Sequence, residues 1–173
     1  MSEAARFYKD GREMMAEPYH YKMCGLDDIY LLNGFKIQTT EYGQGVSVEN
    51  AQELHKEIGR FLILNRKALS RKEIKFLRKE MEVTQEDLGQ CLGVTGQTVA
   101  RYEKGETEIP GPVDKLIRFL YAFHLLPEEQ RAKFLEEVMK AQEELREIDE
   151  KESSPIYFGA TDTGWDEVRR EAA

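Results

Sequence analysis

The sequence predicts a mainly α-helical protein with a small β part. Three observations carry this expectation. β-forming runs flank turn residues near the N-terminus, apolar residues recur at helical spacing from residue 49 onward, and capping residues open the helices. The expected order is an N-terminal antiparallel β-hairpin or short sheet plus a helix, then a bundle of short helices, then a C-terminal helix with a tail. The corresponding domains are residues 1–65, 66–126 and 127–173.

The N-terminal segment carries the β signals. Residues 1–26 show no clear period and are interpreted as a partly ordered arm. Asn33 and Gly34 separate two β-rich runs, residues 29–32 and 35–40, and this dipeptide favours a tight turn because both residues tolerate a positive φ. We therefore expect a hairpin across Asn33 and Gly34, a second turn at residues 43–45, and a third short strand after it.

Two helices are expected on either side of a basic connector. Residues 49–64 carry one apolar stripe at three- and four-residue steps, formed by Ala51, Leu54, Ile58, Phe61 and Leu62. After the connector, Ser70 and Glu73 have the spacing of a capping box. They open a helix whose apolar face is Ile74, Leu77 and Met81.

The C-terminal segment is acidic. Residues 128–150 predict a longer helix with heptad-like apolar spacing, formed by Phe134, Val138, Ala141, Leu145 and Ile148. Packing against the same chain and packing against a dimer mate are both open. The aromatic residues that follow Pro155 either dock onto a surface or belong to a mobile tail.

Composition narrows the class of protein. There are 25 Lys+Arg against 33 Asp+Glu, and the net charge of -8 argues against a wholly basic nucleic-acid coat protein. Residues 66–126 differ from the whole chain in the sign of their charge, because they carry 11 basic and 9 acidic side chains. Two cysteines are too few for a disulfide framework, and no apolar run approaches the roughly 20 residues that cross a bilayer. A cytoplasmic protein without a membrane segment is expected.

Residues 84–105 have suitable residue types at the positions that two short helices joined by a tight turn require. Gly93 suits a left-handed turn position, Thr95 offers an N-cap, and Gly105 ends the second helix. The inward positions are apolar or small: Leu88, Gly89, Leu92, Val94, Val99 and Tyr102. The stretch predicts a helix-turn-helix.

The outward positions suit nucleic acid. Gln97 and Arg101 share a helix face with Thr98 beside them. Glutamine can bind adenine N6 and N7, and arginine can bind guanine O6 and N7. Gly96 leaves room for approach to the groove floor. The predicted DNA-binding residues are Gln85, Thr95, Gly96, Gln97, Thr98, Arg101 and Lys104.

Phosphate contacts are expected beside this face. Gln85 lies at the start of a helix, where backbone N–H groups favour an anion, and Lys104 carries a positive charge. Part of the basic cluster at residues 71–79 is expected to join them. A basic helix face can also be merely solvated, so the cluster alone is weak evidence.

At these residues the chain resembles the phage-repressor-like (Xre) helix-turn-helix family. The resemblance rests on residues 84–89 and 94–95 and on the run Arg-Tyr-Glu-Lys-Gly at residues 101–105, and it covers roughly residues 68–123. Within the family the chain is most similar to MqsA/YgiT-type antitoxins and their regulator relatives. The resemblance implies a five-helix bundle, double-stranded DNA as partner, and base reading by Gln97 and Arg101.

MqsA/YgiT-type antitoxins hold zinc through two Cys-x-x-Cys pairs, and this chain departs from that pattern. His20 and Cys24 are the possible ligands in the matching region, while His55 and His124 lie far off in sequence. No metal or other cofactor is expected, because four tetrahedral ligands cannot be assembled. The start Tyr-Lys-Met-Cys-Gly-Leu-Asp at residues 21–27 is more similar to relatives without zinc pairs.

The sequence therefore predicts a sequence-specific transcriptional regulator that binds a pseudo-palindromic operator as a homodimer. An antitoxin-type interaction module, whose N-terminal domain or acidic tail binds a toxin-like protein, stays an alternative, as does a small-molecule sensor role. No enzyme is expected, because the histidines lack a Ser or Cys neighbour and no phosphate-cradling glycine loop precedes a helix.

Overall fold

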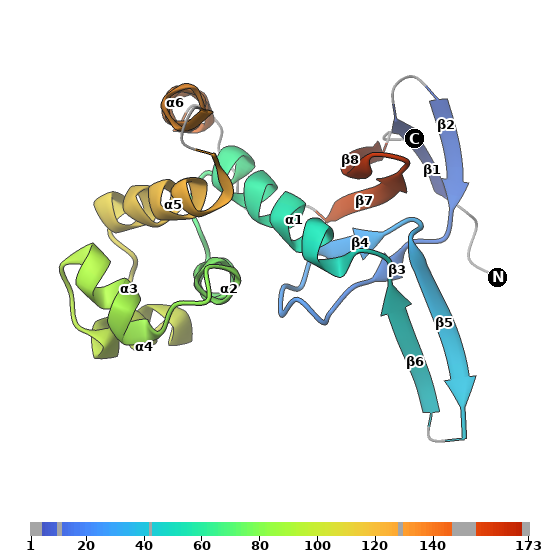
Figure 1. Ribbon diagram of the computed structural model, residues 1–173, viewed down its shortest axis with the longest axis horizontal. Helices are drawn as coiled ribbons and strands as arrows, with labels where there is room; N and C mark the ends of the chain where they lie inside the picture. The colour runs from blue at the N-terminus through green and yellow to red at the C-terminus, as the bar shows by residue number, and fades with distance from the viewer. Residues whose placement is uncertain (1–4, 10–11, 42, 128–129, 147–154, 171–173) are drawn as a thin grey trace. The chain divides into compact units, whose positions relative to one another are not determined.

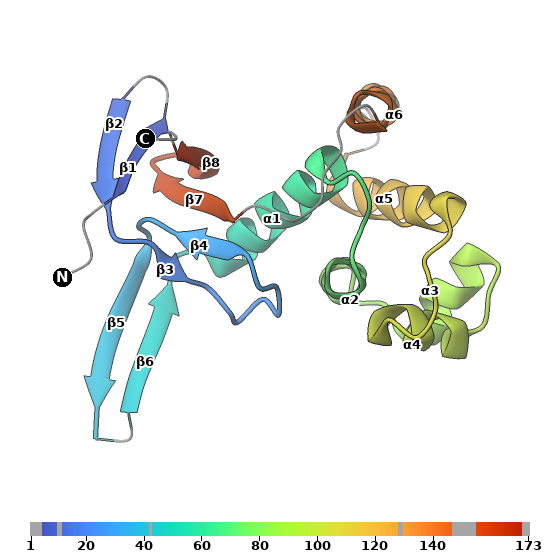
Figure 2. The ribbon, with the colours of Figure 1, turned by 180° about the vertical axis from the view of Figure 1, so that it is seen from behind.

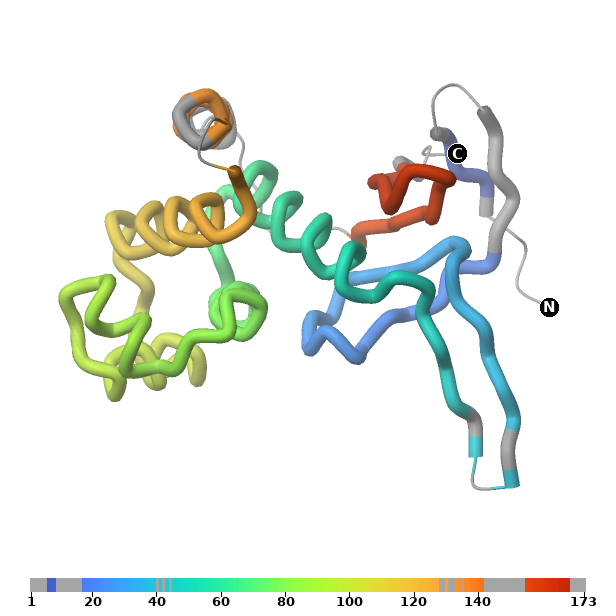
Figure 3. The backbone as a smooth tube through the Cα atoms, viewed as in Figure 1, coloured from blue at the N-terminus to red at the C-terminus, as the bar shows by residue number. Residues whose placement is uncertain are grey.

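The computed structural model describes residues 5–9, 12–41, 43–127, 130–146 and 155–170, and Figure 3 traces the backbone. Its contacts divide the chain into two compact units. Residues 1–57 together with 152–173 form the sheet unit, and residues 58–151 form the helical unit. This division differs from the three predicted domains because residues 152–173 belong with the N-terminal strands.

The sheet unit is built on a six-stranded sheet with the order β2-β1-β8-β7-β4-β3 (Figure 1). β4 and β7 run parallel, and the other neighbours are antiparallel. The strands are β1 Ala5–Lys9, β2 Arg12–Ala16, β3 Tyr19–His20, β4 Ile29–Leu31, β7 Ile156–Thr161 and β8 Gly164–Arg170. The protein is therefore a mixed α and β structure whose β part is larger than expected.

The six-stranded sheet corrects the expectation for the N-terminal end of the chain and decides between the two alternatives for the C-terminal end. Residues 1–26 were expected as a partly ordered arm, yet they contribute β1, β2 and β3. The aromatic C-terminal stretch docks rather than hanging free, because Phe158 and Trp165 are buried. β1 pairs with β8, and Phe7 packs with Leu32 and Val168 in one apolar cluster. Such pairing between the two ends of the chain leaves no local period.

The expected hairpin across Asn33 and Gly34 is wrong. β4 pairs with β3 and β7, whereas the next strand, β5 Phe35–Thr40, belongs to a different sheet. Asn33 instead pairs with the backbone of Ala160, donating from Nδ2 to its carbonyl over 3.2 Å and accepting from its N–H. The dipeptide therefore ends one strand against β7 and redirects the chain into another sheet.

The later hairpin is confirmed, although its turn lies earlier than expected. β5 pairs antiparallel with β6 Gly43–Val48, and Thr40 lies opposite Gly43. The chain therefore reverses before Gly43, and Gly45 lies within the strand. These two strands form a separate two-stranded ribbon.

Gly34 is a position where the backbone and the packing both demand glycine. Its φ is +72°, and an added Cβ would lie 2.5 Å from an aromatic carbon of Trp165. Trp165 cannot yield easily, because its indole N–H donates to the Glu49 carbonyl over 3.1 Å.

We expect Gly34→Ala to destabilise the chain by about 1 kcal/mol more than Gly25→Ala, measured by chemical denaturation. Gly25 is the matched control because its φ is +81° but an added Cβ meets nothing within 4 Å. Equal losses for the two variants would show that the approach to Trp165 costs nothing.

The helical unit contains the predicted helices. The described helices are α1 Ala51–Asn65, α2 Arg71–Glu80, α3 Gln85–Leu92, α4 Gly96–Lys104, α5 Gly111–Leu125 and α6 Arg131–Arg146. The first residues of α1 belong to the sheet unit, and the rest of α1 begins the helical unit. Residues 66–126 hold four helices, α2 to α5, so the five-helix layout is not confirmed there (Figure 2).

Five residues of the two predicted apolar stripes are buried in the part of the chain that the structure describes. Leu54, Ile58 and Leu62 of α1 are fully buried. In α6, Phe134 and Val138 are buried and the helix contacts α5, so this helix packs against its own chain. The predicted helix ends at residues 128–129 and 147–150 lie outside the described residues.

Candidate nucleic-acid interface

Two short helices and the turn between them form the predicted interface. Thr84 caps α3, and its hydroxyl accepts from the Asp87 N–H over 3.1 Å. Thr95 caps α4 in the same way and accepts from the Thr98 N–H over 3.2 Å. Gly93 ends α3 with a left-handed φ of 70°. The predicted N-cap at Thr95 and the predicted glycine turn are confirmed.

The inward side chains of this motif are apolar as predicted. Leu88, Val99 and Tyr102 are buried, and Leu92 and Val94 are half-buried. Burial of Val99 and Tyr102 turns the opposite face of α4, with Gln97 and Arg101, toward solvent, because a helix presents its faces at fixed angular steps.

Gly89 and Gly96 allow the two helices to approach closely. A Cβ on Gly89 would lie 2.8 Å from the Val94 carbonyl oxygen and 2.9 Å from the Gly96 nitrogen. A Cβ on Gly96 would lie 3.0 Å from the backbone of Glu86. Gly89 therefore fills its predicted role, whereas Gly96 is buried against α3 and does not line the outward face as expected.

Gln97 and Arg101 are the two long polar side chains on the outward face of α4. Both are exposed, and neither has a polar partner among the described residues. They lie one helical turn apart, as the spacing predicts. Thr98 is half-buried, and its hydroxyl lies 3.0 Å from that of Thr95, so its hydroxyl already contacts the cap.

Gln85 belongs to an internal network that the sequence did not reveal. Its Nε2 donates to Glu103 Oε2 over 2.8 Å. Arg78 holds the same carboxylate with two bonds, Nε to Oε1 at 2.5 Å and Nη2 to Oε2 at 3.2 Å, and also donates to the Val83 carbonyl. The network ties α2, the start of α3 and α4 together, and it fixes the Gln85 side chain from within the protein.

The basic cluster of α2 divides into internal and exposed members. Arg78 is internal, since only 13% of its side chain is exposed. Arg71, Lys75 and Lys79 are exposed at four-residue steps, which places them on one face of the helix. Arg71 donates from Nη1 to the Lys104 carbonyl over 2.9 Å, so this face begins beside the C-terminal end of α4.

Lys104 and Gly105 complete that end of α4. Lys104 is exposed, with Nζ 3.9 Å from a Glu106 carboxylate oxygen. Gly105 ends the helix with a φ of +75°, as predicted, and the Arg71 side chain lies 3.0 Å from where its Cβ would be.

The start of α3 carries a perturbed carboxyl group. Hydrogen bonds from the hydroxyl and the backbone N–H of Thr84 hold the pKa of Asp87 below its usual value. Asp87 therefore keeps its negative charge to a more acidic pH than an ordinary aspartate, beside a helix N-terminus that favours such a charge. Its capping role was missed because the aspartate replaces the more familiar glutamate of a capping box.

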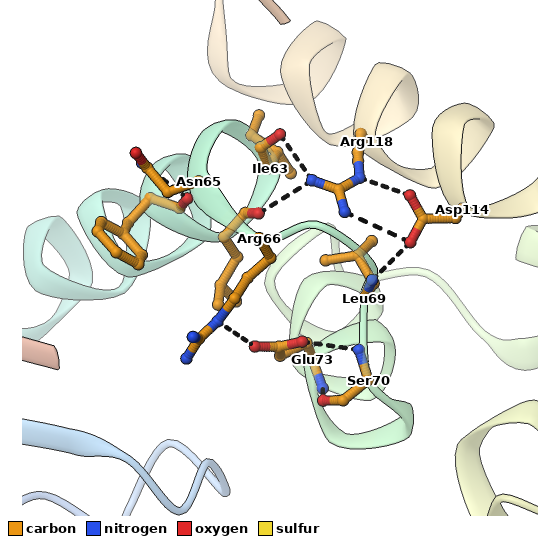
Figure 4. Close-up of polar contacts among 10 residues, drawn as sticks. Ile63, Asn65, Arg66, Leu69, Ser70, Glu73, Asp114 and Arg118 are labelled. Atoms are coloured by element: carbon orange, nitrogen blue, oxygen red, sulfur yellow. Dashed lines mark hydrogen bonds and ion pairs between the residues drawn. The ribbon is translucent and has the colours of Figure 1, made fainter. Parts of the chain in front are cut away.

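Two buried ion pairs, Arg118–Asp114 and Arg66–Glu73, stabilise the helices and the connector that support the helix-turn-helix (Figure 4). Arg118 of α5 donates to Asp114 over 2.6 Å and to the carbonyls of Leu62 and Ile63 over 3.1 and 2.9 Å. Asp114 in turn accepts from the Leu69 N–H over 2.6 Å. The C-terminal end of α1, the connector and α5 are thereby joined at one buried arginine.

The second ion pair lies at the start of α2. Arg66 donates from Nε to Glu73 Oε1 over 2.8 Å, and Glu73 Oε2 accepts from the Ser70 N–H over 2.7 Å. Ser70 Oγ accepts from the Glu73 N–H, which completes the predicted capping box. Arg66 and Glu73 are each only 4% exposed. Arg66, a basic residue of the connector between α1 and α2, is therefore structural.

The residues considered as metal ligands are engaged elsewhere. His20 Nε2 lies 2.6 Å from the Asp27 carbonyl oxygen, and the Tyr21 hydroxyl lies 2.8 Å from His55 Nε2. Cys24 donates to the Tyr21 carbonyl. Within the described part of the chain, no three His, Cys, Asp or Glu side chains are grouped to hold a metal ion.

One known protein family matches the part of the chain that contains the candidate interface. Residues 74–113 match a family model described as helix-turn-helix, and this range runs from α2 into the start of α5. This segment is a helix-turn-helix domain. The range contains all the predicted DNA-binding residues, and the match supports DNA binding and transcription regulation by the domain.

The other comparisons add no relative. No curated protein and no solved structure matches the chain. In the described residues, no helix combines the length and the apolar character that a membrane crossing requires.

Proposed function

We propose that this chain is a sequence-specific, non-enzymatic transcriptional regulator of the Xre type that binds a pseudo-palindromic operator as a homodimer. One observation carries the proposal. Gln97 and Arg101 lie one turn apart on the second helix of a helix-turn-helix domain, both exposed and both without an internal polar partner among the described residues.

The chemistry of these two side chains suits base edges in the major groove. The Arg101 guanidinium can donate two hydrogen bonds to O6 and N7 of a guanine, and the Gln97 amide can bond to N6 and N7 of an adenine. Each good bidentate pair contributes about 1–3 kcal/mol of discrimination against the wrong base. Two such pairs in each half-site are enough to select a short sequence.

Phosphate contacts come from the residues that flank α4. Lys104, Lys75 and Lys79 are exposed cations, whereas the start of α3 carries Glu86 and Asp87 and is closed by its own capping box. Because the whole chain carries a net charge of -8, these local cations must face the DNA while the acidic surfaces face away. Binding is therefore expected to weaken steeply as salt rises.

Within the Xre type we infer a relation to MqsA/YgiT-type regulators that lack the zinc cysteines. The inference is supported by the start Tyr-Lys-Met-Cys-Gly-Leu-Asp at residues 21–27 and by the run at residues 101–105. Cys24 and His20 both bond within the sheet unit, which agrees with a fold that does not depend on zinc there.

Selection of binding sites from random duplexes at physiological salt tests the proposal. The expected result is an enriched pseudo-palindrome whose half-sites are centred about 34 Å apart, one turn of B-DNA. Mobility shifts on the selected duplex across a salt series then give the number of phosphate contacts. Recovery of no enriched sequence, with binding that is equal on all duplexes, would contradict base reading.

A further inference from the structure

The ribbon of β5 and β6 is an unusual element of the sheet unit. It forms its own two-stranded sheet and extends away from the six-stranded sheet, as both views show (Figures 1 and 2). A two-stranded hairpin is at best marginally stable in water without packing against something else. The ribbon therefore needs support along its length.

One face of the ribbon is apolar near its root, whereas Thr39 continues the same face toward the tip. Phe35 lies opposite Val48, and Ile37 lies opposite Val46, so these four side chains share a face. At the root the face is supported, because the Phe35 ring centroid is 4.9 Å from that of Tyr19. Farther out, Ile37 is 52% exposed. The apolar face thus continues from supported residues at the root into solvent.

The opposite face is polar and exposed. It carries Lys36, Gln38, Gly45 and Ser47, all of which are exposed. Because successive side chains of a strand point to opposite faces, the apolar residues gather on one face of the ribbon and the polar residues on the other. Such a pattern is typical of a sheet with one face packed and the other in contact with water. Gln38 offers a matched position on the polar face of the same strand as Ile37.

The charge of the ribbon indicates what covers the apolar face. Lys36 is the single charged residue in the sequence of β5 and β6, although 34% of the chain is charged, and its Nζ lies 3.6 Å from a Glu49 carboxylate oxygen. A nucleic acid would need several cations there. A basic protein would match the acidic surfaces of the chain better than this neutral ribbon.

A second copy of the chain fits the ribbon. Two copies, each with a net charge of -8, repel one another least when they meet at a surface without acidic residues. The cores of protein interfaces are likewise depleted in charged residues. We propose that the apolar face of the ribbon, made of Phe35, Ile37, Val46 and Val48, packs against the same face of a second copy in a two-fold contact.

This inference deepens the proposed function and rests on it, because a pseudo-palindrome requires two copies. The face holds only four apolar side chains, whereas a standard stable interface buries about 1,200 Å² or more. The dimer is therefore weak in free solution, and adjacent half-sites on DNA strengthen it by holding two copies close together.

Sedimentation velocity of the full chain over a concentration series, without DNA, tests the contact. We expect a reversible monomer–dimer equilibrium in which Ile37→Lys raises the dissociation constant about tenfold or more. The matched control Gln38→Lys adds the same charge to the polar face and is expected to change the dissociation constant by about twofold or less.

A second variant distinguishes a weakened contact between copies from unfolding of the ribbon. Ile37→Thr keeps a β-branched residue while removing apolar surface, and it is expected to weaken the dimer with an unchanged thermal transition. A wild-type chain that stays monomeric throughout, or a dimer that Ile37→Lys and Ile37→Thr leave intact, would overturn the contact. Because no DNA is present, either result leaves base reading untouched, whereas a failed site selection contradicts base reading alone.

Discussion

Arg118→Met is expected to lower the free energy of unfolding by about 3–5 kcal/mol. Arg118 is fully buried, and it satisfies Asp114 together with two carbonyl oxygens at the end of α1. Methionine fills most of the volume but donates nothing, so a buried carboxylate and two carbonyl oxygens each lose a donor, and the Leu69 N–H is the other donor that the carboxylate keeps. Removing one partner of a buried pair costs more than the pair itself contributes.

Chemical denaturation followed by far-UV circular dichroism measures this loss. Lys115→Met is the matched control on the neighbouring position of α5, because Lys115 has no polar partner among the described residues; it should change stability by less than about 1 kcal/mol. The double variant Arg118→Met with Asp114→Leu should recover part of the stability, since no lone charge remains. If Arg118→Met and Lys115→Met lowered the free energy of unfolding by similar small amounts, the bonds of Arg118 to Asp114 and to the end of α1 would not stabilise the fold.

Glu103→Ala is expected to destabilise the chain by about 2–3 kcal/mol and to weaken operator binding as well. The Glu103 side chain is 4% exposed and accepts from Arg78 of α2 and Gln85 of α3. Its removal leaves Arg78 without its carboxylate and releases the restraint on Gln85. The cost is below that of a fully buried pair, because Arg78 is partly exposed and can reach water.

The control for this variant lies three residues further along the chain. Glu106 is exposed and 3.9 Å from the Lys104 ammonium, so Glu106→Ala should cost under about 1 kcal/mol. Glu103→Gln should fall between the two, because the amide keeps one acceptor for Arg78. If Glu103→Ala lost no more stability and affinity than Glu106→Ala, the network would not position α4.

The helix-turn-helix could be predicted from the sequence because its signals are local. A cap acts on a backbone N–H two or three residues away, as at Thr95, and a left-handed glycine ends its own helix, as at Gly93. The apolar spacing of Leu88, Val99 and Tyr102 then determines which side of each helix faces the core. Outward placement of Gln97 and Arg101 follows from that orientation.

The remaining features depend on partners that are distant in sequence. Asn33 reads locally as a turn residue, but its amide pairs with Ala160, which lies 127 positions away. Glu103 and Arg78 are separated by 25 residues, so no helical period links them. Gly96 looked like an opening toward DNA, although the residue that fills the space beside it is Glu86 of the preceding helix. A single sequence contains no signal for such pairings.

Binding of Arg101→Ala to the selected operator and to a random duplex, at one salt concentration, tests the central claim most directly. We expect a loss of about 1–3 kcal/mol on the operator, relaxed preference at the base pair that Arg101 contacts, and almost unchanged affinity for the random duplex. An equal loss on both duplexes would mean that Arg101 binds only phosphates, and it would contradict base reading by α4.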